Sequence, residues 1–260
     1  MGNYSFSRNS CSSVFKLLLL SLEQMSITAF NRDKLKKILY NRIIKVYEDR
    51  VINTKDIYRN TLDPFSAVLD AKLLNKNIEN WINDVEIPRQ NQKSLQNFIG
   101  NMHQEVLGTV AGWEDLKTGG VVDLKNDSKK LIAEIKNKHN TTKGNHKKEV
   151  YDDLESLLKT SFRNYTGYYV EILPENGKIY NKEFTPPDNV TKKRRASNKD
   201  IRIIDGKSFY ALVTGKDDAL EQFYNEFPIL IDEILQENFG NYSATDSGNM
   251  RVKLFEKIFT

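Results

Sequence analysis

The stretch that decides the fold spans residues 121–136 and reads Val121-Val-Asp-Leu-Lys-Asn-Asp-Ser-Lys-Lys-Leu-Ile-Ala-Glu-Ile-Lys136. Residues 121–124 are apolar except for Asp123, which is typical of a short strand. Asn126-Asp-Ser128 favours a turn, and residues 130–138 read as a second strand. The stretch therefore predicts a β-hairpin that places Asp123 alongside the second strand.

The second strand has two unlike faces, because alternate side chains of a strand point in opposite directions. One face is apolar and is expected to pack on a helix: Leu131, Ala133 and Ile135. The other face carries charges within the apolar run: Ile132, Glu134, Lys136 and Lys138. Burying a carboxylate and an ammonium together is costly unless they are compensated, and function is a common reason to accept that cost.

The hairpin predicts a catalytic core of Asp123, Glu134 and Lys136. Two carboxylates that converge across the hairpin suit one hard cation, Mg²⁺, completed by water and phosphate oxygens. Lys136 would orient or help deprotonate a water and stabilise a phosphate under attack. The acid-x-Lys spacing is common by chance in so charged a chain, so the strand context carries the prediction. The alternative is an edge hairpin whose outer face is simply solvated.

The rest of the chain predicts an α/β fold in which a mixed central β-sheet is flanked by helices, with a helical N-terminal region. Further strands are expected at residues 168–173 and 208–213, and residues 174–200 read as a long loop. Apolar spacing and caps predict helices at residues 32–50, from Asp63-Pro64 onward, at 92–113, 146–163 and 217–238, with a potential kink at Pro228.

One domain is expected over residues 25–260, with a helical part at 25–113 and the sheet with its flanking helices at 114–240. Residues 1–24 read as an extension, and Met25 is an alternative start. The single cysteine, Cys11, excludes an internal disulfide and favours a reducing, cytoplasmic location. No apolar run approaches the length of a bilayer span. The net charge of +4 permits a polyanionic partner without requiring one.

Several stretches resemble a known family. Val121-Val-Asp-Leu and Ala133-Glu-Ile-Lys136 resemble the PD-(D/E)XK nuclease signature, with Val122 in place of its proline. Wider segments are similar to type II restriction endonucleases of the Eco forty-seven II type, over about residues 52–235. These segments are His103-Gln-Glu-Val-Leu-Gly108, Gly112-Trp-Glu, Ala133-Glu-Ile-Lys-Asn-Lys-His-Asn-Thr141, Lys143-Gly, Tyr168-Tyr-Val-Glu-Ile, Tyr180-Asn-Lys-Glu-Phe-Thr-Pro186 and Ile204-Asp-Gly-Lys-Ser-Phe-Tyr-Ala-Leu-Val-Thr-Gly215.

The resemblance implies a restriction-endonuclease-like fold and Mg²⁺-dependent cleavage of duplex DNA at a short palindrome of the GGNCC class. It further implies 5′-phosphate ends, a homodimer and a cognate DNA methyltransferase that acts on the same site. The backbone carbonyl of Ile135 would complete the metal shell. Glu105, on a helix before the hairpin, would either join it or be an ordinary glutamate at the boundary of the core. The alternatives are a structure-specific repair or junction-resolving nuclease of the same fold, and a DNA-binding module whose acidic pair is inert.

Residues around this core are expected to contact DNA. The segment after the catalytic strand is polar and basic: Asn137, Lys138, Asn140, Thr141 and Lys143. A basic run suits phosphate contact or base reading, although such a run is often only solvated: Lys192, Lys193, Arg194 and Arg195. His103 is expected either to contact a phosphate or to satisfy a core polar group. Packing is expected of four aromatic residues placed in strands: Tyr168, Tyr169, Phe209 and Tyr210.

Overall fold

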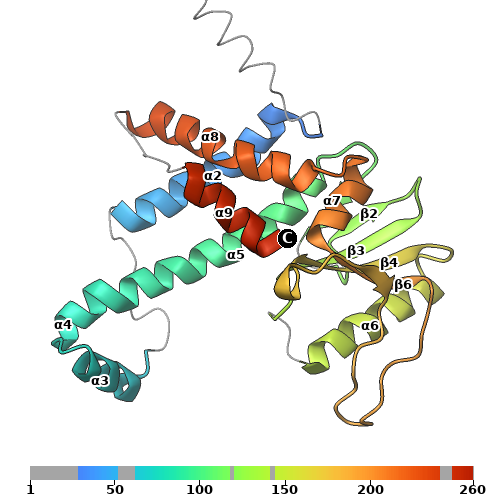
Figure 1. Ribbon diagram of the computed structural model, residues 1–260, viewed down its shortest axis with the longest axis horizontal. Helices are drawn as coiled ribbons and strands as arrows, with labels where there is room; N and C mark the ends of the chain where they lie inside the picture. Colours follow the sequence, from blue (N-terminus) through green and yellow to red (C-terminus); the bar gives the residue numbers. More distant parts are fainter. Residues whose placement is uncertain (1–28, 52–61, 118–119, 141–143, 241–247, 260) are drawn as a thin grey trace, which may run out of the picture.

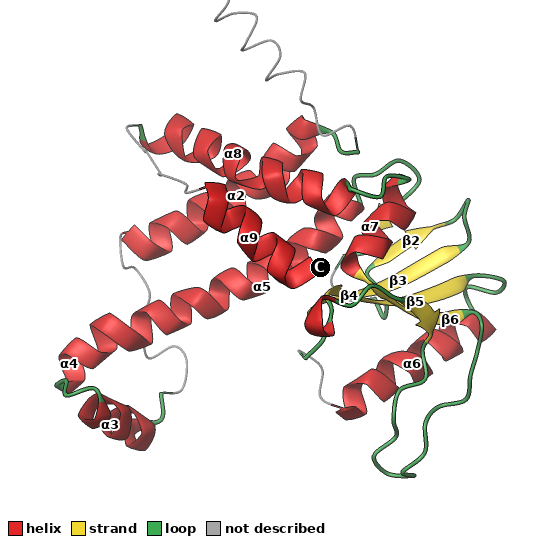
Figure 2. Cartoon of the chain, in the orientation of Figure 1, coloured by secondary structure: helices red, strands yellow, loops and turns green. Residues whose placement is uncertain are grey.

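The computed structural model describes residues 29–51, 62–117, 120–140, 144–240 and 248–259 (Figure 1). The expectations for residues 1–24 and Met25, and for Thr141 and Lys143, lie outside these ranges. In the described chain, a mixed sheet stands at one side of the molecule and long helices fill the other side (Figure 2). This arrangement confirms the predicted α/β class and its helical N-terminal part.

The described strands form one six-stranded sheet in the order β1-β2-β3-β4-β6-β5. Antiparallel pairing joins β1, β2 and β3, and it also joins β5 to β6. Parallel pairing joins β3 to β4 and β4 to β6. The strands are β1 (Glu114–Asp115), β2 (Leu124–Asn126), β3 (Leu131–Lys138), β4 (Thr166–Leu173), β5 (Asn181–Glu183) and β6 (Ile201–Asp205).

The helices that the structure describes are α2 (Arg32–Val51), α3 (Pro64–Leu73), α4 (Ile78–Trp81), α5 (Ile87–Leu107), α6 (Gly144–Lys159), α7 (Gly206–Thr214), α8 (Ala219–Phe239) and α9 (Gly248–Phe259). A π-helical segment, Ile82–Glu86, joins α4 to α5, and a 3₁₀ turn covers Glu175–Gly177. Asp63 caps α3 by accepting from the backbone N–H of Phe65, with Pro64 at the first helical position, as the sequence predicts.

The two faces of β3 separate as the alternation predicts. Leu131, Ala133 and Ile135 belong to a core that includes residues of α5, α7 and α8. Ile132 belongs to a second core, with Val150, Tyr151 and Leu154 of α6. Figure 1 shows α6 on one side of the sheet and α7 on the other. Glu134 and Lys136 therefore lie on the α6 face.

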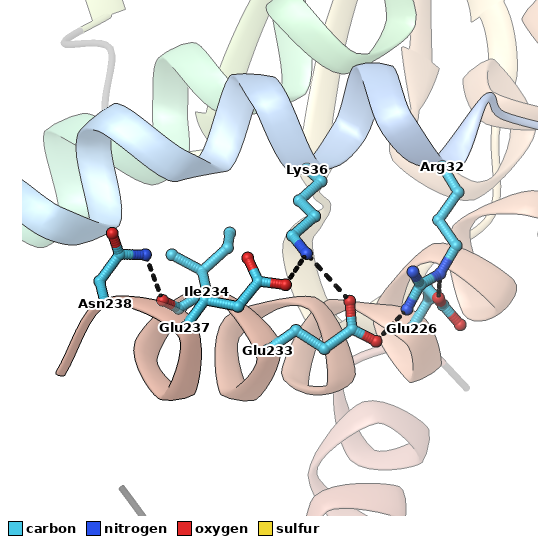
Figure 3. Close-up of polar contacts among 7 residues, drawn as sticks. All are labelled: Arg32, Lys36, Glu226, Glu233, Ile234, Glu237 and Asn238. Carbon is cyan, nitrogen blue, oxygen red and sulfur yellow. Dashed lines mark hydrogen bonds and ion pairs between the residues drawn. The ribbon is translucent and has the colours of Figure 1, made fainter. Parts of the chain in front are cut away.

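The N-terminal helix α2 is tied to α8 by a row of ion pairs, which Figure 3 shows in detail. Arg32 contacts Glu226 at 2.7 Å and Glu233 at 2.5 Å. Lys36 contacts Glu237 at 2.6 Å and Glu233 at 3.5 Å. The hydrogen bond with Glu233 raises the pKa of Arg32 above its ordinary value. Because Leu35 and Leu39 of α2 also belong to the main core, the helical part packs together with the sheet domain.

Three expected elements need correction. Residues 208–213 form helix α7 rather than a strand, because Asp205 caps the helix through the backbone N–H of Ser208. The strand at this place is β6, which ends just before α7. The long loop at 174–200 contains the short strand β5. Helix α5 spans Ile87–Leu107 instead of the predicted residues 92–113.

Candidate active site

Asp123 is fixed to the hairpin at three points. Its backbone N–H donates to the carbonyl of Ala133 at 2.9 Å, and its own carbonyl accepts from the N–H of Leu116 at 2.9 Å. Its side-chain Oδ2 accepts from the backbone N–H of Ile135 at 2.7 Å. The carboxylate is thereby held at the middle of β3. It lies next to Glu134, the residue that precedes Ile135.

Glu134 and Lys136 form an ion pair on β3. Their side chains are 13% and 27% exposed, so both are largely shielded but can be reached from solvent. The hairpin therefore brings together all three residues that the sequence predicts as the catalytic core. Lys136 is held by the carboxylate of Glu134, which lies on the same strand.

Burial and proximity shift the pKa values of the two carboxyl groups. Burial, together with the nearby charge of Asp123, raises the pKa of Glu134 to about 7 against the lowering effect of Lys136. Burial also raises the pKa of Asp123, against the lowering effects of the Ile135 N–H and of Lys136. Two partly buried carboxylates that repel each other are an arrangement that a bound cation relieves.

The chemistry of these donors fits a divalent cation. Among the residues that the structure describes, no group of three or more His, Cys, Asp or Glu side chains is arranged to hold a metal. Mg²⁺, however, is commonly bound through one or two carboxylates, with waters and phosphate oxygens for the rest of its shell. Asp123 and Glu134 supply such a pair. The carbonyl of Ile135 remains a predicted ligand.

Glu105 lies on α5 and forms an ion pair with Arg42 of α2. Both line a polar cleft of about 460 Å³, which Asp115 and Lys117 also line. Asp115 links this cleft to the hairpin, since its charge contributes to raising the pKa of Asp123. The structure does not place Glu105 with Asp123 and Glu134, and its part in the metal site stays a prediction.

The segment after Lys136 begins beside a cavity on the helical side of the sheet. Asn137 lines a largely apolar cavity of about 330 Å³ with residues of α5, α8 and α9, and its buried Oδ1 has no hydrogen-bond partner. Lys138 is partly buried and also lines this cavity. Asn140 is exposed. DNA contact by these residues remains a prediction, and Asn137 is the least accessible to a phosphate.

The basic run lies in an excursion between β5 and β6, where Arg194 pairs with Pro187 in an isolated bridge. Arg195 contacts Asp152 of α6 at 2.6 Å, and Arg194 Nε donates to the carbonyl of Thr185 at 2.8 Å. These arginines therefore hold the excursion in place. Lys192 and Lys193 are exposed.

His103 is a core residue. Its side chain is buried, and its Nδ1 is 2.7 Å from the hydroxyl of Tyr210. Burial lowers the pKa of His103 to about 4, so the ring is neutral at ordinary pH. Packing is confirmed for Tyr168, Tyr169 and Phe209 as well as for Tyr210, although the last two lie on a helix.

Two charged groups near this site were missed from the sequence. Asp115 is in β1, a two-residue strand that no apolar alternation reveals. Glu171 is a buried acid within the apolar strand β4, and it is paired with Lys147 of α6. The signal that singled out Glu134, a charge inside an apolar strand, is equally present in Tyr168-Tyr-Val-Glu-Ile.

The mixed six-stranded sheet flanked by helices is that of a restriction-endonuclease-like α/β fold, the fold of a class of nucleases. The model of the Eco47II restriction endonuclease family matches residues 28–236, and the chain belongs to this family. The type II restriction enzyme Eco47II of Escherichia coli is 41% identical over 189 residues, which are 72% of this chain and 78% of that protein. The type II restriction enzyme Sau96I of Staphylococcus aureus is 30% identical over 203 residues, 77% of this chain and 76% of that protein.

Enzymes of this class cleave double-stranded DNA at defined sites and use a divalent metal ion. No helix in the described part of the chain is long and apolar enough to cross a membrane.

Proposed function

We propose that this chain cleaves duplex DNA at a short palindrome by Mg²⁺-dependent phosphodiester hydrolysis at Asp123, Glu134 and Lys136. The observation that carries the proposal is the convergence of these three side chains on one hairpin, with Asp123 bound to the N–H of Ile135 and Lys136 bound to Glu134. The two relatives named above, both type II restriction enzymes, support the same reaction.

Each residue of the cluster has a distinct task. Asp123 and Glu134 would hold the cation, with the carbonyl of Ile135 as a further ligand. When bound, the cation would stabilise charge on the phosphate and lower the pKa of a water. Lys136 Nζ has three N–H donors, of which Glu134 needs one. The others would orient the attacking water and donate to the phosphate oxygen on which negative charge develops. The products would carry a 5′-phosphate and a 3′-hydroxyl.

The remaining predicted contacts with DNA follow from charge and exposure. Lys192 and Lys193 are the members of the basic run whose ammonium groups are accessible to a phosphate. Arg194 and Arg195 would act from positions that are already braced on the protein. The DNA strand that approaches the catalytic hairpin would be contacted by Lys138, Asn140, Thr141 and Lys143. Asn137 would face the helical side of the sheet. Glu105 would join the metal site if its pairing with Arg42 opened.

Family membership supports a recognition site of the GGNCC class, and with it a DNA methyltransferase that protects the same site in the cell. A cytoplasmic location follows from these substrates and from the single cysteine. Residues 25–260 would form one domain, because both ends of the described chain pack into the core through Phe30 and Phe259.

We propose a homodimer in which α3 supplies contact surface. Figure 1 shows α3 and α4 at the far end of α5 from the sheet. Large apolar side chains that are 42–85% exposed gather on this unit: Phe65, Val68, Leu69, Leu73, Leu74 and Ile78. A standard interface buries roughly 800 Å² of each partner, to which such a set of exposed apolar side chains would contribute. A largely apolar set of side chains suits DNA poorly, whereas a second copy matches it across a two-fold axis.

Sedimentation measurements test this surface. Leu69→Glu combined with Leu73→Glu should convert a dimer into a monomer, because it would bury four carboxylates at a symmetric contact. Leu254→Glu on α9, where Leu254 is 57% exposed, is the matched control and should leave the dimer intact. Dissociation by the control, or a dimer that survives the α3 changes, would place the interface elsewhere.

Digestion of a sequenced plasmid tests the function itself. Discrete fragments with Mg²⁺, ends that map to GGNCC sites, and no cutting in EDTA are the expected result. Smearing would indicate cleavage by structure instead of sequence. Binding without cutting under any divalent ion would indicate a DNA-binding module.

A further inference from the structure

Glu171 of β4 lies directly opposite Lys136 in the parallel ladder between β3 and β4. In a parallel pair, residues in register point to the same face of the sheet. Glu171 is also two residues from Tyr169, which is buried in the core formed with α6. Glu171 therefore shares the α6 face with the catalytic pair, although it is only 3% exposed.

Both carboxylate oxygens of Glu171 have partners. Oε1 accepts from Lys147 Nζ at 2.5 Å, and Oε2 accepts from the hydroxyl of Tyr180. The backbone N–H of Tyr180 in turn donates to Asp205 Oδ2 at 2.8 Å, at the end of the next strand. Lys147 Nζ also lies 5.7 Å from the centroid of the Tyr169 ring. The ammonium of Lys147 is thus held by the carboxylate of Glu171 and by the ring of Tyr169.

Two carboxylate–lysine pairs therefore lie on the α6 face of the sheet, on the adjacent strands β3 and β4: Glu134 with Lys136, and Glu171 with Lys147 of α6. The Lys147 side chain is 23% exposed, close to the 27% of Lys136, so both side chains are partly open to solvent. Glu171 occupies one N–H of Lys147, which leaves donors for a second acceptor.

Stability alone is a weak reason for this second pair. A buried carboxylate that is paired with an ammonium usually contributes no more than well-packed apolar residues would. A positive charge held rigidly beside a phosphate-cleaving cluster has a clear use, because phosphate contacts fix the register of a protein on a duplex.

We propose that Lys147 binds a phosphate of the DNA strand being cut, next to the one at the Asp123–Glu134–Lys136 cluster, and that Glu171 is its positioning residue. The proposal rests on the proposed function and extends it. Lys147 would donate to a non-bridging phosphate oxygen while Glu171 and Tyr180 fix the direction of its side chain. The DNA strand would then cross from β3 toward the first turn of α6, the helix that runs beneath the sheet in Figure 1.

Lys147→Gln and Lys148→Gln form a matched pair for the test. Lys148 is the next residue along α6, its side chain is 26% exposed, and it contacts Asp152 at 3.4 Å instead of the Glu171 group. Both variants are made in an Asp123→Asn background, and duplex binding is measured with Mg²⁺ over a range of salt. Loss of one phosphate contact should reduce the slope of log K against log salt by about 0.9 for Lys147→Gln only. Equal slopes for both variants would overturn the proposal.

Glu171 is tested by non-additivity in the otherwise native chain. Glu171→Gln should slow single-turnover cleavage, and adding it to Lys147→Gln should cause no further loss, because Glu171 acts through Lys147. If the losses in cleavage rate of the two single variants multiply in the double variant, Glu171 does not act through Lys147. A pair that only fastens α6 would lower the melting temperature of Lys147→Gln and leave the salt slope unchanged.

Failure here is distinguishable from failure of the proposed function. The native chain is first assayed for Mg²⁺-dependent cutting, which tests the catalytic cluster alone. If it cuts and the slopes of the two lysine variants agree, only the role of Lys147 is wrong.

Discussion

The carboxylate of Asp123 accepts a hydrogen bond from the backbone N–H of Ile135 at 2.7 Å. This bond joins the residue just before β2 to the middle of β3, so it fixes both the register of the hairpin and the place of the acid. Glu134, the neighbour of Ile135, is thereby brought beside Asp123, and burial with this neighbouring charge raises the pKa of Glu134 to about 7. The same contact explains how Asp123 and the triplet Glu134-Ile-Lys136, which are separate in the sequence, can form one site.

Glu134→Gln should change how stability depends on pH in the metal-free protein. A carboxyl whose folded pKa is raised from 4.5 to about 7 stabilises the fold below pH 4.5 and loses that contribution as pH rises through 7. The native chain should therefore lose about 2–3 kcal/mol of unfolding free energy between pH 4.5 and pH 8 from this group, and the variant should not. Urea unfolding in EDTA measures the difference.

Glu149→Gln, which removes an exposed carboxyl from α6, is the control and should retain the native pH dependence. Mg²⁺ should stabilise the native chain at pH 8 more than it stabilises Glu134→Gln, because ligand binding adds to the folding free energy. An identical pH dependence of the native chain and Glu134→Gln would refute the coupling of these carboxyl groups.

His103→Gln should make the protein more tolerant of acid. Burial lowers the pKa of His103 from 6.5 to about 4, so the unfolded chain takes up a proton in this window before the folded chain does. The contribution of the neutral His103 ring to the unfolding free energy is complete above pH 6.5 and is lost as the pH falls toward 4. Between pH 7 and pH 5 the native chain should lose about 2 kcal/mol through this residue. Unfolding curves that shift equally for both proteins would contradict the assignment.

Gly206→Ala should be strongly destabilising. A Cβ at this position would lie 2.4 Å from the carbonyl oxygen of Ile172 and 2.7 Å from its Cα, which are backbone atoms of β4. The start of α7 would have to move from the sheet, at a cost of about 2–3 kcal/mol. Gly100→Ala in α5 is the control, because its Cβ would lie at an ordinary contact distance of 3.9 Å from Asn137 Cβ. That change should stabilise the helix by roughly 0.5–1 kcal/mol, and a loss equal to that of Gly206→Ala would be unexpected on this account.

Lys192→Ala combined with Lys193→Ala should weaken DNA binding and flatten its salt dependence. Both side chains are exposed, and the loss of two phosphate contacts would reduce the slope of log K against log salt by about 1.8. Lys159→Ala removes a similarly exposed lysine from the far end of α6 and should leave the slope as it is. A native slope in the double variant would show that the two lysines are only solvated.

The catalytic hairpin was predictable because its signals are local. The charge in an apolar strand, the turn and the alternation all lie within residues 121–138, and β3 forms at Leu131–Lys138 much as predicted. The first strand is β2 at Leu124–Asn126 and not at residues 121–124, so the turn follows Asn126 and Asp123 lies just before the strand. Helix α7 was mistaken for a strand because Ser208 to Val213 is too short for its period to separate strand from helix. The cap at Asp205 and the close approach of Gly206 to β4 decide it.

The rest of the site depends on contacts between distant residues. Strand β5 is polar and exposed, so its pairing with β6 leaves no apolar pattern in the sequence. Lys147 and Glu171 are 24 residues apart and meet only because α6 packs against β4. Asn137 follows the catalytic strand directly, yet alternation turns it toward the helical side, where its Oδ1 is buried.

The most direct test of the catalytic hairpin compares Asp123→Ala with Asp127→Ala. Asp127 is in the turn of the same hairpin and its side chain is 62% exposed. Both variants and the native chain are assayed for cutting and for binding of a duplex with one GGNCC site in Mg²⁺. Asp123→Ala should cut roughly 10³-fold more slowly or worse while it still binds, and Asp127→Ala should cut like the native chain. Near-native cleavage by folded Asp123→Ala would contradict the account.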